Sequence, residues 1–175
     1  YKSGGGGGGI HPNNSILIPD MKQPIFEKLL RFVYNVDDGQ SLIIETPEVA
    51  KQLLRAAVRF TYTPFQEAVE DRIIAPTANN RLLTISNAAS FYVFADANSC
   101  WKVKATAMTV ISSNLIEVMA DDPTGWSELV VESSLPLLQE LLYDVWKNTS
   151  LSSSAEEDTM KLTNLLALVD VTPQL

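Results

Sequence analysis

NAASFYVFADANSCWKVKATAMTVI, residues Asn87–Ile111, is a long apolar segment with four aromatic residues and only three charged ones. From Ala88 to Ala97 it is apolar almost all round a helical projection, which is typical of a helix surrounded by protein. We therefore predict a central core helix here. After Asn98-Ser99, a second helix is expected from about Trp101 to Ile111.

Three helices that begin at prolines are predicted before this segment. Residues 24–34 start with Pro24 and carry apolar side chains at helical spacing. Thr46-Pro47 and Thr63-Pro64 then repeat one device, a threonine that can cap backbone N–H groups and a proline suited to the first helical position. Gln66 completes a capping box with Thr63. The two Thr-Pro helices are expected to pack as neighbours, and no further internal repeat is visible.

Both Thr-Pro helices are predicted to be amphipathic. The first has a polar stripe of Lys51, Arg55 and Arg59, opposite Ala50, Leu53, Leu54, Ala57 and Phe60. In the second, Phe65, Ala68, Val69 and Ile73 are expected to face inward, and Glu67, Glu70 and Asp71 outward.

Further helices are predicted after Ile111. Asn114 offers a cap, with Glu117 three residues on, for a short helix that ends near Ala120. The residues GWSELVV give another turn or two. Pro136 begins a last clear helix, in which Leu138, Leu141, Leu142 and Val145 share a face.

Strands are expected only near the N-terminus. SILI, Ser15–Ile18, is closed by Pro19-Asp20 and is interpreted as a strand of about four residues. SLIIE, Ser41–Glu45, is either a second short strand or part of a loop. The predicted fold class is therefore mainly α, a helical bundle with one or two short strands near the N-terminus.

Composition and charge narrow the possible partners. The chain has 175 residues, of which 46% are hydrophobic and 19% charged, as is typical of a folded soluble domain. Its formal net charge of -8 favours neither nucleic acid nor an anionic membrane surface as a partner. The single cysteine cannot form an internal disulfide, and no apolar run is long enough to span a bilayer. We expect a cytoplasmic or nuclear protein, and the first residue, Tyr1, favours a fragment or a processed product.

The sequence contains a histidine, a cysteine and two aspartate pairs that could in principle take part in catalysis or metal binding. We expect none of them to do so. His11 lies in a glycine-rich leader, where no rigid surroundings would hold it. Cys100 lies at a helix start, but ordered sequence offers no histidine as its base, so a small buried hydrophobe is preferred. Asp37-Asp38 and Asp121-Asp122 lack the spacing of a calcium loop and are interpreted as solvated turns. We therefore expect no catalytic residue, metal or cofactor, and a protein that is not an enzyme.

Several segments, in order, resemble the second half of a BTB/POZ domain, most closely that of the MATH-BTB (speckle-type POZ protein-like) family. The matching positions are Ile18–Met21, Phe26–Tyr34, Leu53–Phe60, Val69–Asp71 and Asn87–Asp96. The residues LIEVMADDPTGWSELVVESSLPLLQELL resemble the helical extension that supplements cullin binding after such domains. The resemblance divides the chain into a flexible leader (1–14), a partial BTB/POZ domain of α+β type (15–111), a helical extension similar to a cullin-binding box (112–147) and a largely disordered tail (148–175).

The resemblance implies a protein-protein interaction module: a substrate adaptor of cullin-RING E3 ubiquitin ligases that can self-associate. Such an adaptor makes or breaks no bond, and it promotes protein ubiquitination by holding a substrate near the ligase. Leu115, Val118, Met119 and Trp126 are the residues predicted to contact the cullin scaffold. The alternative is that these four residues pack the extension onto the core.

The chain also departs from the family. The first half of the domain and a substrate-binding domain are absent from this sequence, and GGGGGGIHPNN stands where family members carry a hydrophobic-any-acidic motif that enters a cullin groove. A second hypothesis is therefore a BTB scaffold or oligomerisation protein of transcriptional or cytoskeletal type, which assembles with other proteins without a cullin.

Overall fold

The computed structural model describes residues 18, 21–34, 42–75 and 81–150. Within these ranges the chain is mainly helical, which confirms the predicted fold class. The helices are α1 (Gln23–Val33), α2 (Pro47–Arg59), α3 (Thr63–Ile74), the 3-10 helix η1 (Ile85–Asn87), α4 (Ala88–Ala97), α5 (Trp101–Ser113), α6 (Leu115–Asp121), α7 (Pro123–Ser127), the π-helical turn η2 (Glu128–Glu132) and α8 (Leu135–Ser150).

The predicted short strands are not confirmed. Of the residues 15–18, only Ile18 is described, and it belongs to no strand. Leu42–Glu45 form a loop that leads into α2. Of the strand and the loop considered for this segment, the structure has the loop. Ile44 of this loop is fully buried, and the apolar run therefore supplies a core side chain instead of a strand pairing.

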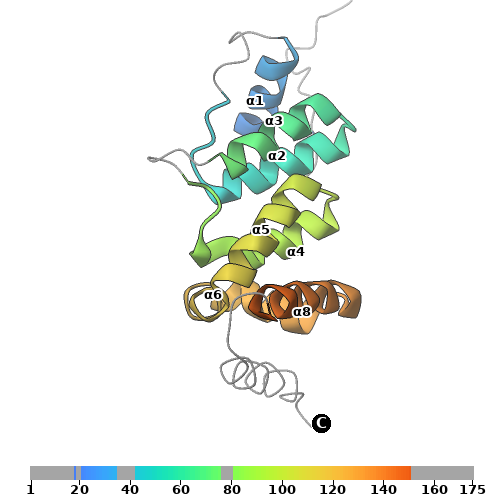
Figure 1. Cartoon of the computed structure of the whole chain (residues 1–175). Coiled ribbons are helices and arrows are strands. Elements are labelled where there is room, and N and C mark those ends of the chain that lie inside the picture. The colour runs from blue at the N-terminus through green and yellow to red at the C-terminus, as the bar shows by residue number, and fades with distance from the viewer. Residues whose placement is uncertain (1–17, 19–20, 35–41, 76–80, 151–175) are drawn as a thin grey trace, which may run out of the picture.

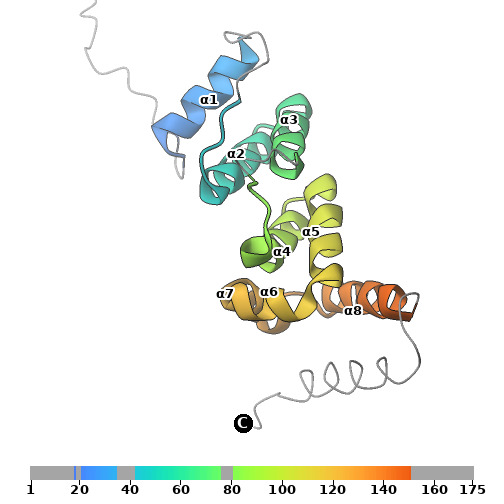
Figure 2. The same cartoon turned by 60° about the vertical axis from the view of Figure 1, so that its left-hand side comes forward.

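The helices form three successive tiers (Figure 1). In both views α1–α3 lie at one end, α4 and α5 in the middle and α6–α8 at the other end (Figure 2). The middle tier contacts both neighbours, because α5 packs against α3 on one side and α8 on the other. The predicted pairing of the two Thr-Pro helices, α2 and α3, is confirmed.

The predicted central helix is confirmed with the expected bounds. Six of its residues are buried: Ala88, Ala89, Phe91, Tyr92, Phe94 and Ala95. These residues lie on several sides of α4, because α2, α5 and α7 pack around it. The small side chains on one turn and the aromatic ones on the next let neighbouring helices approach closely while the core stays filled.

The two predicted threonine caps have different outcomes. Thr46 caps α2, since its side chain accepts a hydrogen bond from the backbone N–H of Val49. Thr63 is instead the first residue of α3, whose N-cap is Tyr62 without a side-chain hydrogen bond. The predicted Thr63–Gln66 capping box is therefore wrong, and the Gln66 side chain donates instead to the carbonyl of Ser99, in the turn before α5.

The α2–α3 hairpin and the α4–α5 hairpin are closed by turns of the same type. Thr61 and Ser99 have φ values of 52° and 55°, the left-handed conformation that ends many helices. The next residue, Tyr62 or Cys100, donates its N–H back to the carbonyl five positions earlier. Inward-facing residues also correspond, with Phe65, Val69 and Ile73 of α3 matched by Val103, Ala107 and Ile111 of α5. The fold thus repeats a hairpin that is not visible as a sequence repeat.

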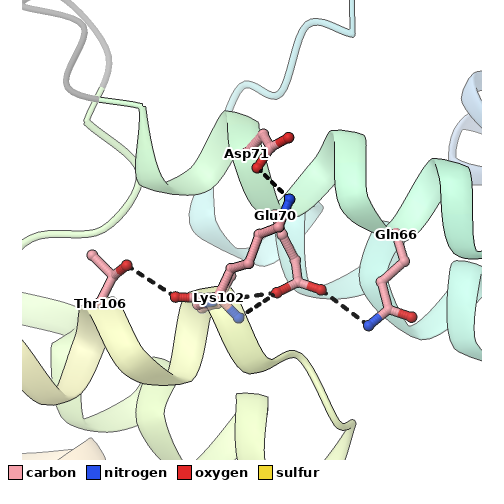
Figure 3. A network of polar contacts seen from close by, with 6 residues as sticks. Gln66, Glu70, Asp71, Lys102 and Thr106 are labelled. Carbon is pink, nitrogen blue, oxygen red and sulfur yellow. Dashed lines mark hydrogen bonds and ion pairs between the residues drawn. The ribbon is translucent and has the colours of Figure 1, made fainter.

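Glu70 links the first hairpin to the second (Figure 3). It was predicted to face outward with Glu67 and Asp71, but its side chain is buried. Its carboxylate accepts the N–H groups of Lys102 at 2.9 Å and Val103 at 3.3 Å, and Gln66 donates to it from the preceding turn of α3. Backbone N–H groups at a helix start lack partners within the helix, and Glu70 supplies one from another helix.

Candidate protein-binding surface

The last tier is fixed to the middle one by polar contacts inside an apolar interface. Lys104 of α5 lies 2.8 Å from Asp96 of α4 and 2.7 Å from Glu140 of α8. Burial lowers the pKa of Lys104, but its hydrogen bonds to the two carboxylates outweigh that effect, so the pKa is raised overall. The Tyr92 hydroxyl donates to the carbonyl of Leu137 at 3.3 Å, and burial raises the pKa of this phenol. The position of α8 is therefore fixed by α4 and α5 together.

Asp122 holds the junction of α6 and α7 against α4. Its carboxylate accepts the N–H of Ser90 and that of Gly125, each at 3.0 Å. The prediction of a solvated turn is therefore wrong for Asp122, which is buried, and its neighbour Asp121 is exposed. A Cβ on Gly125 would meet the Asp122 oxygens at 2.5 and 2.7 Å and also overlap the Ser90 nitrogen. Only glycine fits this contact without rearrangement.

The four predicted partner-contact residues lie in different surroundings. Val118 is 0% exposed and belongs to the core. Leu115 and Trp126 are partly buried and pack against that core. Met119 is partly exposed on α6. The predicted capping box at Asn114 does not form, and the Asn114 side chain donates instead to the carbonyl of Val110 in α5.

Other apolar side chains of the last tier point to solvent. Ile116 on α6 is 72% exposed, and Tyr143 and Trp146 on α8 are 64% and 51% exposed. Val131 and Leu135 are also exposed, at the end of η2 and the start of α8. We call these five residues the C-terminal apolar surface. Helical periodicity could have identified Tyr143 and Trp146, because they fall outside the face shared by Leu141 and Val145.

The tyrosine and tryptophan of this surface are neighbours. Their ring centroids lie 6.1 Å apart with the planes tilted by 39°. Aromatic rings presented together on one turn of a helix are common contact groups at protein interfaces, because they bury a large area with few rotatable bonds.

The reactive groups of the described residues have structural roles. Cys100 is buried, and burial, with Glu70 nearby, raises the pKa of its thiol to about 12. Lys51 donates to the Ser90 hydroxyl and lies over the rings of Phe91 and Phe94, and burial lowers its pKa. The predictions for His11 and for Asp37-Asp38 lie outside the described residues.

Within the described ranges, no group of three or more His, Cys, Asp or Glu side chains is placed to hold a metal ion. In the same ranges, every helix is too short or too polar to cross a membrane. No protein-family model matches the chain, and no solved structure matches it.

Proposed function

We propose that this chain is a protein-protein interaction module, a partial BTB substrate adaptor for a cullin-RING ubiquitin ligase. The observation that carries the proposal is the order of the matching segments, from Ile18–Met21 to Asn87–Asp96, followed by the extension from Leu115 onward. Each segment alone is short, and their occurrence in one order is more specific than any of them.

The proposed mode of action is positioning. The adaptor would hold a substrate protein close to the ligase and raise its effective concentration there, so no residue of the adaptor needs to act as acid, base or nucleophile. The Cys100 thiol is buried and its pKa is raised, so it is a poor nucleophile, and the proposed role requires none. The cytoplasm or the nucleus would be the place of action.

We assign the cullin contact to α6. Met119 and Leu115 retain this role from the sequence prediction, and Ile116 is added because it is the most exposed large apolar side chain of that helix. Val118 belongs to the core beneath them, and Trp126 of α7 packs against that core. An apolar helix face of this kind fits the helix-in-groove mode of recognition.

Calorimetric titration of the chain against a purified cullin N-terminal region tests the proposal. Binding should weaken at least tenfold on Ile116→Asp or Met119→Asp, because an ionised carboxylate would be buried in an apolar contact. Val58→Asp, at an exposed apolar position of α2, is the matched control and should leave the affinity unchanged. Equal loss in all three variants would contradict a contact at α6.

The second candidate is a BTB scaffold that assembles with proteins other than a cullin. The hexaglycine run at Gly4–Gly9 favours it, because no acidic residue follows Ile10 where family members carry the cullin-groove motif. Ordering such a run would also oppose docking through lost backbone entropy. If the titration shows no cullin binding, even when the first half of a BTB/POZ domain is fused before this chain, the scaffold is the better assignment.

A further inference from the structure

A pocket of about 320 Å³ lies between the start of α1 and one face of α2. This size is at the lower end of the range for ligand pockets, about 300–1,000 Å³. It is on the first tier, far along the fold from the C-terminal apolar surface. Its interpretation does not depend on the function proposed above.

The pocket combines an apolar floor with cationic side chains. Met21, Ile25 and Ala56 supply the apolar part, and Lys22, Arg55 and Arg59 supply three positive charges. Among the described residues, no aspartate or glutamate lines it, although acidic residues outnumber basic ones by 21 to 13 in the whole chain. The described part of the lining is therefore basic within an acidic chain.

The backbone adds to this positive character. Lys22 is the N-cap of α1, where the helix dipole is positive and where a negative group is usually preferred. The Lys22 side chain makes no cap hydrogen bond, and the first turn of α1 contains no acidic residue. An anion bound here would interact favourably with the helix end and with Lys22 at the same time.

Arg55 is positioned to bind a carboxylate. The carbon of its guanidinium lies over the ring of Phe94, 5.0 Å from the centroid, and this contact restricts the side chain. A guanidinium in such a contact can still use its N–H groups to bind a planar, two-oxygen partner. Arg55 itself is exposed, so a partner can reach it.

We propose that this pocket binds a short acidic peptide segment of a partner protein, in which an aliphatic side chain is flanked by glutamate or aspartate. The aliphatic side chain would rest on Ile25 and Ala56, and the carboxylates would pair with Lys22 and Arg55. A free inorganic anion would use only the cationic part of the pocket, and a purely apolar segment would use only the floor. The combined lining selects the mixed peptide.

Fluorescence anisotropy with a labelled Glu-Asp-Leu-Glu-Asp peptide and the full chain tests this proposal. The double variant Lys22→Gln/Arg55→Gln should weaken binding about tenfold or more, because it removes two charge-assisted contacts. The matched control is Arg81→Gln/Lys147→Gln, which removes the same charge at exposed positions elsewhere and should bind like the unaltered chain. Circular dichroism of each variant checks that the helices are retained.

A second peptide, with serine in place of leucine, separates a built site from general charge attraction. It should bind several-fold more weakly, because it leaves the apolar floor uncovered. Equal affinity for the two peptides, equal loss in the control variant or absence of binding to the unaltered chain would each overturn the proposal.

Discussion

At the scale of single residues, Glu70 has a structural role in joining α3 to α5. It is an acidic side chain on a helix, yet it is buried and accepts two N–H groups at the start of α5. These N–H groups would be left without partners if the carboxylate were removed, so the stability of the α3–α5 contact depends on one side chain.

We predict that Glu70→Ala lowers the free energy of unfolding by about 2 kcal/mol, the sum of a lost helix cap and desolvated N–H groups. Glu70→Gln keeps one acceptor oxygen and should cost less. Urea unfolding followed by circular dichroism measures both. Glu67→Ala, at an exposed position of the same helix, is the control, and an equal effect there would contradict the capping role.

Cys100 predicts a particular dependence of stability on pH. An ordinary thiol has a pKa of 9.0, and in the folded chain burial raises the pKa of Cys100 to about 12. The unfolded chain therefore loses this proton first, and the thiol's contribution to stability, complete below pH 9.0, is lost as the pH rises to about 12. In that range the decline should reach about 1.4 kcal/mol per pH unit.

Unfolding by urea at several pH values, in the unaltered chain and in Cys100→Ala, measures this effect. The alanine variant removes the thiol but leaves Tyr92 and the lysines, so the difference between the two curves isolates the cysteine. Curves that stay parallel from pH 8 to pH 11, within the range in which titration should separate them, would show that Cys100 is not shielded from solvent.

At the scale of secondary structure, α7 depends on the absence of a side chain at Gly125. Alanine normally favours a helix over glycine by about 1 kcal/mol. Here its Cβ would overlap Asp122 and the backbone of Ser90, so we predict that Gly125→Ala lowers the free energy of unfolding by about 1–3 kcal/mol. Ser127→Ala, at an exposed position of the same helix, is the control for helix propensity. A stabilised Gly125→Ala variant in chemical denaturation would contradict the close packing of α7 on α4.

The attachment of α8 gives another prediction. Lys104→Ala leaves Asp96 and Glu140 facing each other without the cation between them, and we expect a loss of about 2 kcal/mol together with faster amide exchange in α8. Lys102→Ala breaks the solvent-exposed pair with Asp71 and should have no measurable effect. Unfolding curves and hydrogen exchange by mass spectrometry measure the two variants, and unchanged exchange in α8 of the Lys104 variant would show that apolar packing alone holds the helix.

Helix positions were largely predictable, but the hydrogen-bond partners that link one helix to another were not. The bounds of α4 follow from the apolar segment itself, and the prolines at positions 24, 47 and 64 mark three helix starts. The Thr63–Gln66 box failed because Thr63 is the first residue of α3 and not its N-cap, and because Gln66 donates instead to Glu70 and to the carbonyl of Ser99, which only tertiary contact brings within reach. Local spacing shows that a side chain can cap its own helix, but it carries no information about acceptors on another helix.

At the scale of the whole molecule, the C-terminal apolar surface predicts association. We interpret its five exposed apolar side chains, of which Tyr143 and Trp146 are neighbouring aromatic rings, as contact groups for another protein. We expect the sedimentation coefficient of the chain to rise with concentration, and Leu135→Gln/Tyr143→Gln to reduce that rise. Ile43→Gln, an exposed apolar position in the loop before α2, is the control. A coefficient that is independent of concentration in the unaltered chain would contradict this prediction.

Less of the candidate surface than of the fold could be predicted from the sequence. Val118 and Ile116 are both apolar residues of the same short helix, and which of them faces solvent depends on how α6 sits on α5 and η1. A helix of two turns offers too few residues for its periodicity to fix that orientation. On the longer α8, the apolar face is well defined, and Tyr143 is outside it in the sequence as well as in the structure.

The arrangement in tiers also has a consequence for folding during translation. The α2–α3 hairpin contacts α1, and later helices are needed only for the sides that meet α4 and α5. Polypeptides acquire structure from the N-terminal end while translation continues. The first tier can therefore begin to pack on the ribosome before α6–α8 have been synthesised, and each nascent hairpin gives the next one a surface on which to fold.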